Sequence, residues 1–309
     1  MTGMADLQEK LDWVERLARG SVWGRFRYDP LRYTAAIAYW RLVYPLRKKG
    51  YPVLARTFFG AEMQVVLPAA TEIFLFGAKT HDSEIRLARF LMKHLCPGDT
   101  FCDVGAHFGY FTLLASHLVG ATGNVYAFEA SRSTFDILQN NTAHTANVTA
   151  LHRAAADEDK VLVFNEFPVL FSEYNSLVLP QKKHAGGGRS NRPRKCEVQG
   201  QRLDDFFAKT KGTLPAIVKI DVEGAEPQVL LGMEGLLRGT APPLIVMEYI
   251  TDDDQREAHR TAVSFARSFG YETFRITANG EMAGCEDIET AMMGEGLHSD
   301  NIVLKMGHR

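Results

Sequence analysis

Residues 103–112 read Asp-Val-Gly-Ala-His-Phe-Gly-Tyr-Phe-Thr, and they continue an apolar run that starts at Thr100. A strand that passes through a glycine-rich turn into a helix brings backbone N–H groups to the carboxyl edge of a parallel sheet, where such folds bind nucleotides. A dinucleotide fingerprint needs glycine at positions 105, 107 and 110, but this sequence has His107 and Tyr110 at the last two. The stretch predicts a nucleotide-like ligand other than NAD.

Helices and strands alternate on both sides of this turn, which is typical of βαβ units and a parallel sheet. The sequence predicts a doubly wound α/β domain over residues 81–309, with the last two strands paired as an antiparallel hairpin on the sheet edge. The expected strands are 100–104, 124–128, 148–155, 216–220, 244–248, 271–276 and 301–305, and the expected helices are 85–95, 110–118, 133–143, 227–237 and 255–268.

Residues 1–80 form an N-terminal α+β appendage in this interpretation. Apolar residues at helical spacing predict a helix over 5–19, and residues 51–79 are expected to form short strands joined by turns. Within the main domain, residues 160–200 interrupt the alternation with β-like pieces and a basic, glycine-containing loop.

The segment 33–46 is apolar and aromatic, and Arg47, Lys48 and Lys49 follow it. Such a segment can rest on an anionic membrane surface or pack into a core. We favour packing into the core, because Pro45 interrupts the segment.

Composition narrows the class of protein. The chain has 309 residues, a net charge of -2 and 23% charged residues, so no excess of basic charge attracts nucleic acid. Its four cysteines lack the spacing of a disulfide framework or a zinc site, and no run of about twenty apolar residues suggests a membrane span. The N-terminus does not resemble a secretory signal. We expect a cytoplasmic protein that binds no nucleic acid.

Two acidic residues follow neighbouring strands. Glu129 ends the strand 124–128 and is placed to accept hydrogen bonds from both hydroxyls of a ribose. Asp157, just past the third strand, is positioned for an adenine amino group, although it also suits a solvated turn.

With these features the sequence resembles the FkbM-type S-adenosylmethionine (SAM) dependent methyltransferases, a branch of the class I methyltransferase fold. The resemblance spans about residues 80–306. It is carried by residues 103–112, by Val125-Tyr-Ala-Phe-Glu-Ala130, by Leu203-Asp-Asp-Phe206, by Val218-Lys-Ile-Asp-Val-Glu-Gly-Ala-Glu226 and by Asp300-Asn-Ile-Val303.

The resemblance implies a Rossmann-like, seven-stranded sheet with an antiparallel final strand. It also implies SAM as the methyl donor and O-methylation of a hydroxyl on a sugar or secondary metabolite. The donor-binding residues carried over from the matching motifs are Asp103, Gly105, His107, Gly109, Tyr110, Phe111, Glu129 and Ala130.

Carboxylates after the fourth and fifth strands are the candidates for acceptor chemistry, because a hydroxyl acceptor needs a base. Asp221 or Glu223 is the expected base, and Glu226 and Glu248 are expected beside the acceptor. Glu226 also suits a helix N-terminus, where the helix dipole stabilises an acid. Asp221, Glu223 and Glu248 could instead hold a divalent cation, which we do not favour. His107 is an alternative base, although bordering the donor pocket fits it better.

Three questions stay open at this level. The basic run at 182–195 either attracts an acidic acceptor or is a solvated loop, and we favour the loop. A non-catalytic nucleotide-binding module and a methyltransferase acting on protein or RNA are the alternatives to an enzyme with a small-molecule acceptor. The identity of the acceptor and the oligomeric state are not encoded in any motif found here.

Overall fold

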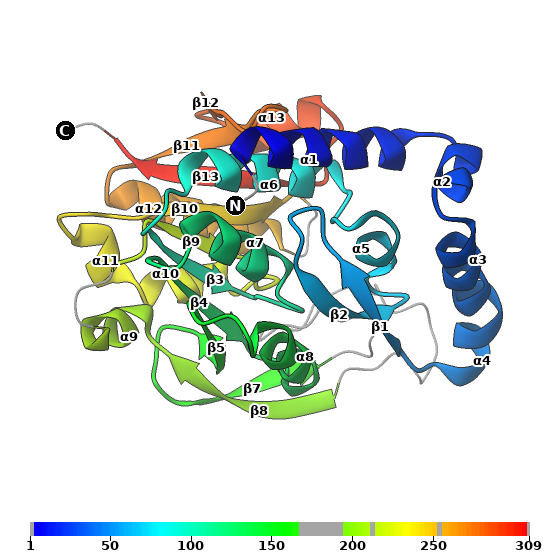
Figure 1. Cartoon of the computed structure of the whole chain (residues 1–309). Coiled ribbons are helices and arrows are strands. Elements are labelled where there is room, and N and C mark those ends of the chain that lie inside the picture. The colour runs from blue at the N-terminus through cyan, green and yellow to red at the C-terminus, as the bar shows by residue number, and fades with distance from the viewer. Residues whose placement is uncertain (1–2, 167–193, 211–213, 252–254, 308–309) are drawn as a thin grey trace.

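The computed structural model describes residues 3–166, 194–210, 214–251 and 255–307. Its centre is an eight-stranded sheet in the order β12-β11-β13-β10-β9-β3-β4-β5 (Figure 1). β3, β4, β5, β9 and β10 are parallel, and β13 is antiparallel to both its neighbours. The strands are β3 (Thr100–Val104), β4 (Asn124–Glu129), β5 (Val148–His152), β9 (Ile217–Ile220), β10 (Leu244–Ile250), β11 (Tyr271–Ile276), β12 (Met282–Gly284) and β13 (Ser299–Met306).

Helices cover both faces of this sheet, as the uninterrupted apolar strands require. One core joins the sheet to α1, α6 and α7, and the opposite core joins it to helices α9–α13. The helices are α1 (Met4–Arg19), α6 (Asp82–His94), α7 (Tyr110–Val119), α8 (Arg132–Thr142), α9 (Leu203–Lys209), α10 (Glu226–Leu231), α11 (Glu234–Arg238), α12 (Arg256–Ser268) and α13 (Ile288–Gly294). None of the helices in the described ranges has the length and apolar character needed to cross a bilayer.

The strand order confirms the doubly wound class I methyltransferase fold. The chain runs outward through β3, β4 and β5 and then returns to add β9 on the other side of β3. Adjacent carboxyl ends at this reversal leave the crevice in which doubly wound folds bind ligands. Seven strands match the expected ones, although the expected strand 148–155 divides into β5 and a strand of a second sheet, and the three-residue strand β12 adds an eighth at the edge.

The expected antiparallel hairpin of the last two long strands is present at one end of the sheet. β13 pairs with β11 as predicted, but it also pairs with β10 and so lies inside the sheet. The apolar strand β13 gains burial on both sides there, which an edge position would not give it.

The expected helix 227–237 is two short helices, α10 and α11. The chain breaks at Gly232, where an added Cβ would lie 2.0 Å from the carbonyl oxygen of Ala156. Close backbone contact, rather than helix propensity, decides this break.

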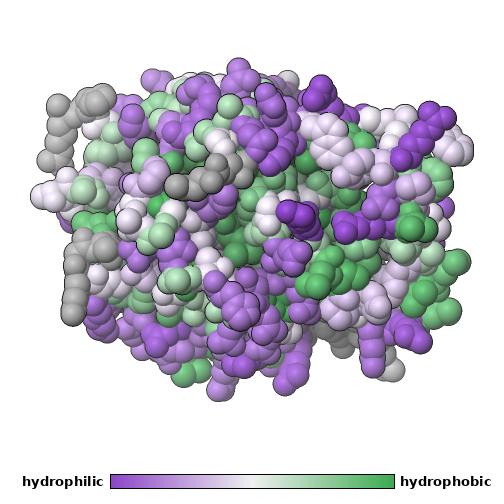
Figure 2. Space-filling model, viewed as in Figure 1, coloured by the Kyte–Doolittle hydropathy of each residue, from purple (hydrophilic) through white to green (hydrophobic). Residues whose placement is uncertain are grey.

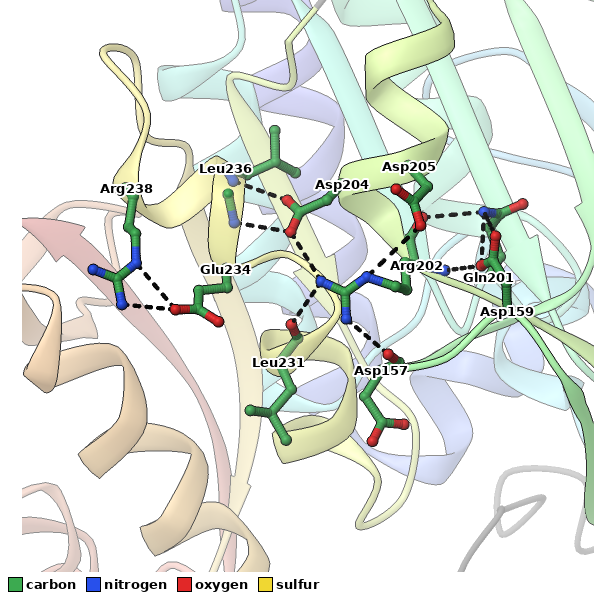
Figure 3. A network of polar contacts seen from close by, with 11 residues as sticks. Asp157, Asp159, Gln201, Arg202, Asp204, Asp205, Leu231, Glu234, Leu236 and Arg238 are labelled. Atoms are coloured by element: carbon green, nitrogen blue, oxygen red, sulfur yellow. Dashed lines mark hydrogen bonds and ion pairs between the residues drawn. The ribbon is translucent and has the colours of Figure 1, made fainter.

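The Leu203-Asp-Asp-Phe206 motif has a structural role that Figure 3 shows. Asp204 accepts hydrogen bonds from the backbone N–H groups of Gly235 and Leu236, at 2.8 and 2.9 Å, and so caps α11 from α9. Arg202 donates to the carbonyl oxygen of Asp157 at 2.7 Å and to Asp204 at 3.3 Å. The network ties the small sheet that precedes α9 to the α10–α11 region.

That small sheet, β6-β8-β7, corresponds to the β-like interruption expected at 160–200. It consists of β6 (Ala154–Ala155), β7 (Val161–Glu166) and β8 (Arg194–Gln201). Most of the basic loop expected at 182–195 lies outside the described residues.

The N-terminal residues combine helices and a hairpin, as predicted, and they share the main core. Leu7 and Leu11 of α1 and Met63 of the hairpin belong to the same buried cluster as Phe90 and Phe101. The elements are α2 (Val22–Tyr28), α3 (Pro30–Ala38), the π-helix η1 (Tyr39–Val43), α4 (Tyr44–Arg47), β1 (Tyr51–Arg56), β2 (Glu62–Leu67) and α5 (Thr71–Phe76).

Two expectations for this region are wrong. Residues 71–76 form the helix α5 rather than a strand, because a short apolar run has no periodicity that separates the two. The segment 33–46 is helical, but it is not a core helix: of the residues from 31 to 47, only Ala36 and Tyr44 are buried.

Candidate active site

A cavity of about 600 Å³ lies at the carboxyl edge of the central sheet. The ends of β3, β4 and β9, the middle of β10 and the start of β13 contribute to its wall. From the predicted site it is lined by Gly105, His107, Phe111, Glu129, Ala130, Asp221, Glu223 and Glu248. The structure therefore brings these eight of the expected site residues to one cavity.

The glycine turn is held by close backbone contact between two loops. Gly105 has a φ of +78°, and an added Cβ would lie 1.8 Å from the carbonyl oxygen of Asp221. The N–H groups of Gly105 and Ala106 both donate to the carbonyl oxygen of Phe128 at 3.0 Å. Only glycine at position 105 lets the β3–α7 turn and the β9–α10 loop approach in this way.

Glu129 lies at the tip of β4 and is 6% exposed. One carboxylate oxygen accepts the N–H of His107 at 2.8 Å, and the other accepts the N–H of Ser131 at 2.9 Å. Burial raises the pKa of Glu129 to about 7, although these two hydrogen bonds act to lower that pKa. Each carboxylate oxygen retains a further lone pair for a ligand in the cavity.

A buried lysine connects the turn to the acidic loop. Lys219 Nζ lies 3.2 Å from Asp103 Oδ1, 3.3 Å from Asp221 Oδ2 and 3.3 Å from the carbonyl oxygen of Gly105. Burial lowers the pKa of Lys219, but Asp103 and Asp221 outweigh it and the pKa is raised. Asp103 also accepts the hydroxyl of Thr112 at 2.6 Å and does not line the cavity, so it positions Lys219 and α7.

Three carboxylates converge on the opposite side of the cavity. One oxygen from each of Asp221, Glu223 and Glu248 lies within 4.8 Å of the others. Burial and the charges of Glu248 and Asp221 raise the pKa of Glu223, and burial with Asp221 and Glu226 raises that of Glu248 to about 8. The spacing suits a shared proton and also a hard cation, the alternative not favoured from the sequence.

Asp221 differs from its two neighbours. Burial raises its pKa, but the charges of Lys219 and Lys79 outweigh burial and bring the pKa below the ordinary value. Of the two bases expected from the sequence, Glu223 therefore holds a proton more readily than Asp221 near neutral pH.

Glu226 lies behind the cavity wall rather than in it. Its carboxylate accepts the N–H groups of Val222 and Gly224, each at 3.3 Å, and lies 3.6 Å from His259 Nε2. This arrangement corrects the expected contact with the acceptor. Glu226 instead fixes the loop that carries Asp221 and Glu223.

Four other expected residues have different places. His107 lines the cavity with a pKa lowered to about 3, chiefly by burial and then by Lys79, so it is a weak base. Gly109 and Tyr110 begin α7 outside the cavity lining, and Tyr110 is buried against Phe111. Asp157 also lies outside the lining and contributes its carbonyl oxygen to Arg202. For Gly109, Tyr110 and Asp157, contact with the donor is not supported by this geometry, whereas His107 borders the cavity as expected.

One group of lining residues missed at the sequence level comes from the segment 69–87, and others, such as Arg153, Lys219 and Asn301, come from the sheet side. The residues of the segment 69–87 form a largely polar wall opposite the sheet, and Lys79 pairs with Glu84 there. Glu72 of α5 accepts the N–H and hydroxyl of Thr80, at 2.9 and 2.8 Å, and its pKa is raised by burial and by Glu84. The lining residues of this wall are Ala69, Glu72, Lys79, His81, Ser83, Glu84 and Leu87.

The fold and the cavity together define a class I methyltransferase scaffold. The chain belongs to the FkbM methyltransferase family, because the family model described as the methyltransferase FkbM domain matches residues 103–273, more than half of the chain. This range contains the glycine turn, Glu129 and all three carboxylates of the acidic cluster.

One curated relative is the protein named Methyltransferase 1 of Beauveria bassiana (strain ARSEF 2860). It is 27% identical over 150 residues, which cover 45% of this chain and 60% of the relative. The match thus spans about 60% of the length of that relative.

Solved structures of methyltransferase scaffolds are similar at low identity. Precorrin-6y C5,15-methyltransferase from Geobacter metallireducens has a TM-score of 0.39 at 15% identity, covering 72% of this chain and 88% of that chain. The O-methyltransferase from Bacillus cereus in complex with S-adenosylhomocysteine (SAH) has a TM-score of 0.38 at 12% identity, covering 71% and 78%. The strand order described above, and not these similarities, defines the fold.

Proposed function

We propose that the protein is a SAM-dependent O-methyltransferase whose acceptor is a small hydroxylated molecule, such as a sugar or a natural product. The observation that carries this proposal is the convergence, in one cavity, of Glu129 at the tip of β4 and the carboxylate cluster beyond β9 and β10. Family membership supports the reaction class.

The residues of the cavity fit the donor. Glu129 has unused acceptor positions for the two ribose hydroxyls, and Gly105 provides a surface without a side chain beside it. Bound SAM supplies an electrophilic methyl group on a sulfonium. Phe111 and His107 line the same part of the cavity, so they are placed to exclude water from the donor.

The acidic cluster supplies the proton acceptor. As the acceptor oxygen forms its new bond to carbon, its proton passes to a carboxylate, for which we propose the ionised form of Glu223, whose raised pKa makes it a stronger proton acceptor than Asp221. Glu248, within the same cluster, can share that proton, because its charge raises the pKa of Glu223 and its own pKa is also raised. Asp221 stays ionised against Lys219 and orients the loop.

The polar wall of residues 69–87 supports an acceptor with several hydroxyls. His81, Ser83 and Glu84 offer donors and acceptors of hydrogen bonds opposite the carboxylate cluster. His81 and Ser83 hydrogen-bond each other and Glu84 pairs with Lys79, so this wall is polar where it meets the acceptor.

A cytoplasmic location is also part of the proposal. All four cysteines are free, Cys102 is buried and Cys96 is exposed, which suits a reducing compartment.

Release of SAH from a panel of acceptors tests the proposal. We expect turnover with a sugar or polyketide hydroxyl, and Glu223→Gln should lower kcat about 100-fold or more while SAH binding is retained. The matched control is Glu257→Gln, an exposed acid on α12. Binding of SAH without turnover on any hydroxyl would support a non-catalytic module, and turnover only on protein or RNA would move the acceptor to another class.

A further inference from the structure

The N-terminal elements α2, α3, η1 and α4 form a column at one side of the molecule, separated from the central sheet by α5 and the β1–β2 hairpin (Figure 1). We call the outward side of this column the α2–α4 surface. It covers residues 22–49. Only Ala36 and Tyr44 of these residues are buried, so the column is held by few core contacts.

In this column, several large apolar side chains face the solvent instead of the core. Leu31, Leu42 and Leu46 are 84%, 67% and 85% exposed, and Trp23 on α2 is 73% exposed. Leu42 and Leu46 are four residues apart along η1 and α4, a spacing that places them as neighbours on one side, and Leu31 lies in the first turn of α3. Figure 2 shows hydrophobic side chains at this edge of the molecule, beside strongly hydrophilic ones. A helix that faces water on this side would normally carry polar residues there.

The same stretch is strongly basic. Residues 21–50 contain seven lysines and arginines and one acid, whereas the whole chain has a net charge of -2. The single acid, Asp29, lies 3.5 Å from Arg32. In the part of the chain that the structure describes, no carboxylate pairs with Arg41, Arg47, Lys48 or Lys49, so their charge is presented to whatever covers the surface.

The positive charge of the α2–α4 surface distinguishes two possible binding partners, a second copy of the chain and a lipid bilayer. A second copy bound through the same surface would place two strongly cationic patches against each other, which opposes association. An anionic bilayer matches both features, since apolar side chains enter the headgroup boundary while lysines and arginines remain at the phosphates.

We propose that the α2–α4 surface binds the surface of an anionic phospholipid bilayer, with Trp23, Leu31, Leu42 and Leu46 inserted and the basic residues at the lipid phosphates. This docking is a function beyond methyl transfer. The docking surface is also connected to the cavity, because α3 packs on α5 and Glu72 of α5 lines the cavity. In that contact Arg32 lies over the Phe74 ring, 5.4 Å from its centroid.

Co-sedimentation of the full chain with vesicles tests the proposal. We expect the protein to pellet with vesicles of phosphatidylcholine and phosphatidylserine in equal parts, but not with phosphatidylcholine alone, and high salt should release it. Replacing the three basic residues in Arg47→Gln/Lys48→Gln/Lys49→Gln should lower partitioning about 100-fold. Leu42→Glu/Leu46→Glu should lower it more than about 10-fold.

Met293→Glu on α13, an exposed apolar residue outside the surface, is the matched control and should bind like the parent. Because Leu42 and Leu46 are exposed, their variant should keep the thermal midpoint of the parent, which separates lost docking from misfolding.

Absence of pelleting with anionic vesicles would overturn the proposal, as would equal binding by the parent and both variants. A dimer that Leu42→Glu/Leu46→Glu dissociates, without vesicle binding by the parent, would identify a second copy as the occupant and overturn it as well. None of these readouts depends on methyl transfer.

Discussion

Replacing Gly105 with alanine should destabilise the protein by about 2 to 5 kcal/mol. The left-handed backbone at φ +78° costs a residue with a side chain about 1–2 kcal/mol. The added Cβ would also lie 1.8 Å from the carbonyl oxygen of Asp221, so the turn and the β9–α10 loop must move apart. Overpacking of this kind costs about 1–3 kcal/mol more.

Gly60→Ala is the matched control for this prediction. Gly60 has a φ of +90°, but nothing lies within 4 Å of an added Cβ, so only the backbone cost applies. Urea denaturation of both variants, with m-values compared to the parent, gives the difference due to the loop contact. Equal losses of stability in the two variants would refute the close approach on which the shape of the cavity depends.

Two further predictions concern buried charges. Lys219→Met should lower the unfolding free energy by about 3–5 kcal/mol, because it leaves Asp103 buried without its ion pair. Adding Asp103→Asn to this variant should recover part of the loss. A loss below about 1 kcal/mol in urea denaturation would contradict this role of Lys219. Glu248 has a folded-state pKa of about 8, above its unfolded value, so the folded state binds the extra proton and stability falls as pH rises from about 4.5 to about 8. Glu248→Gln should flatten that fall, by at most about 5 kcal/mol, in denaturation curves measured across this range. An unchanged slope would show that another group titrates.

The features that could be predicted from the sequence are those determined by the order of strands, turns and helices along the chain. A glycine turn after an apolar strand and an acid after the next strand meet at one edge, because the carboxyl ends of parallel strands share it. This rule was enough to place Gly105, Glu129 and Asp221 in one cavity. Lys219 was visible as the only charged residue in the buried strand 217–220, but its role needs Asp103 beside it.

Other features depend on contacts between distant segments. Whether Leu42 and Leu46 are buried depends on which elements lie outside them, and their apolar character alone wrongly predicted a core helix. Glu72 and Glu84 reach the cavity only because the segment 69–87 folds over the sheet edge. Likewise, β13 lies between β10 and β11, where long-range pairing, not chain order, decides the neighbours.

The most direct test of the central claim is calorimetric titration of SAH into the parent protein, Glu129→Ala and the control Glu158→Ala. Glu158 is an exposed acid outside the cavity lining. Loss of two hydrogen bonds from ribose hydroxyls to a buried carboxylate predicts at least about 100-fold weaker binding for Glu129→Ala, with the control unchanged. Equal affinity in all three proteins, or no binding to the parent, would contradict the assignment of this cavity to the methyl donor.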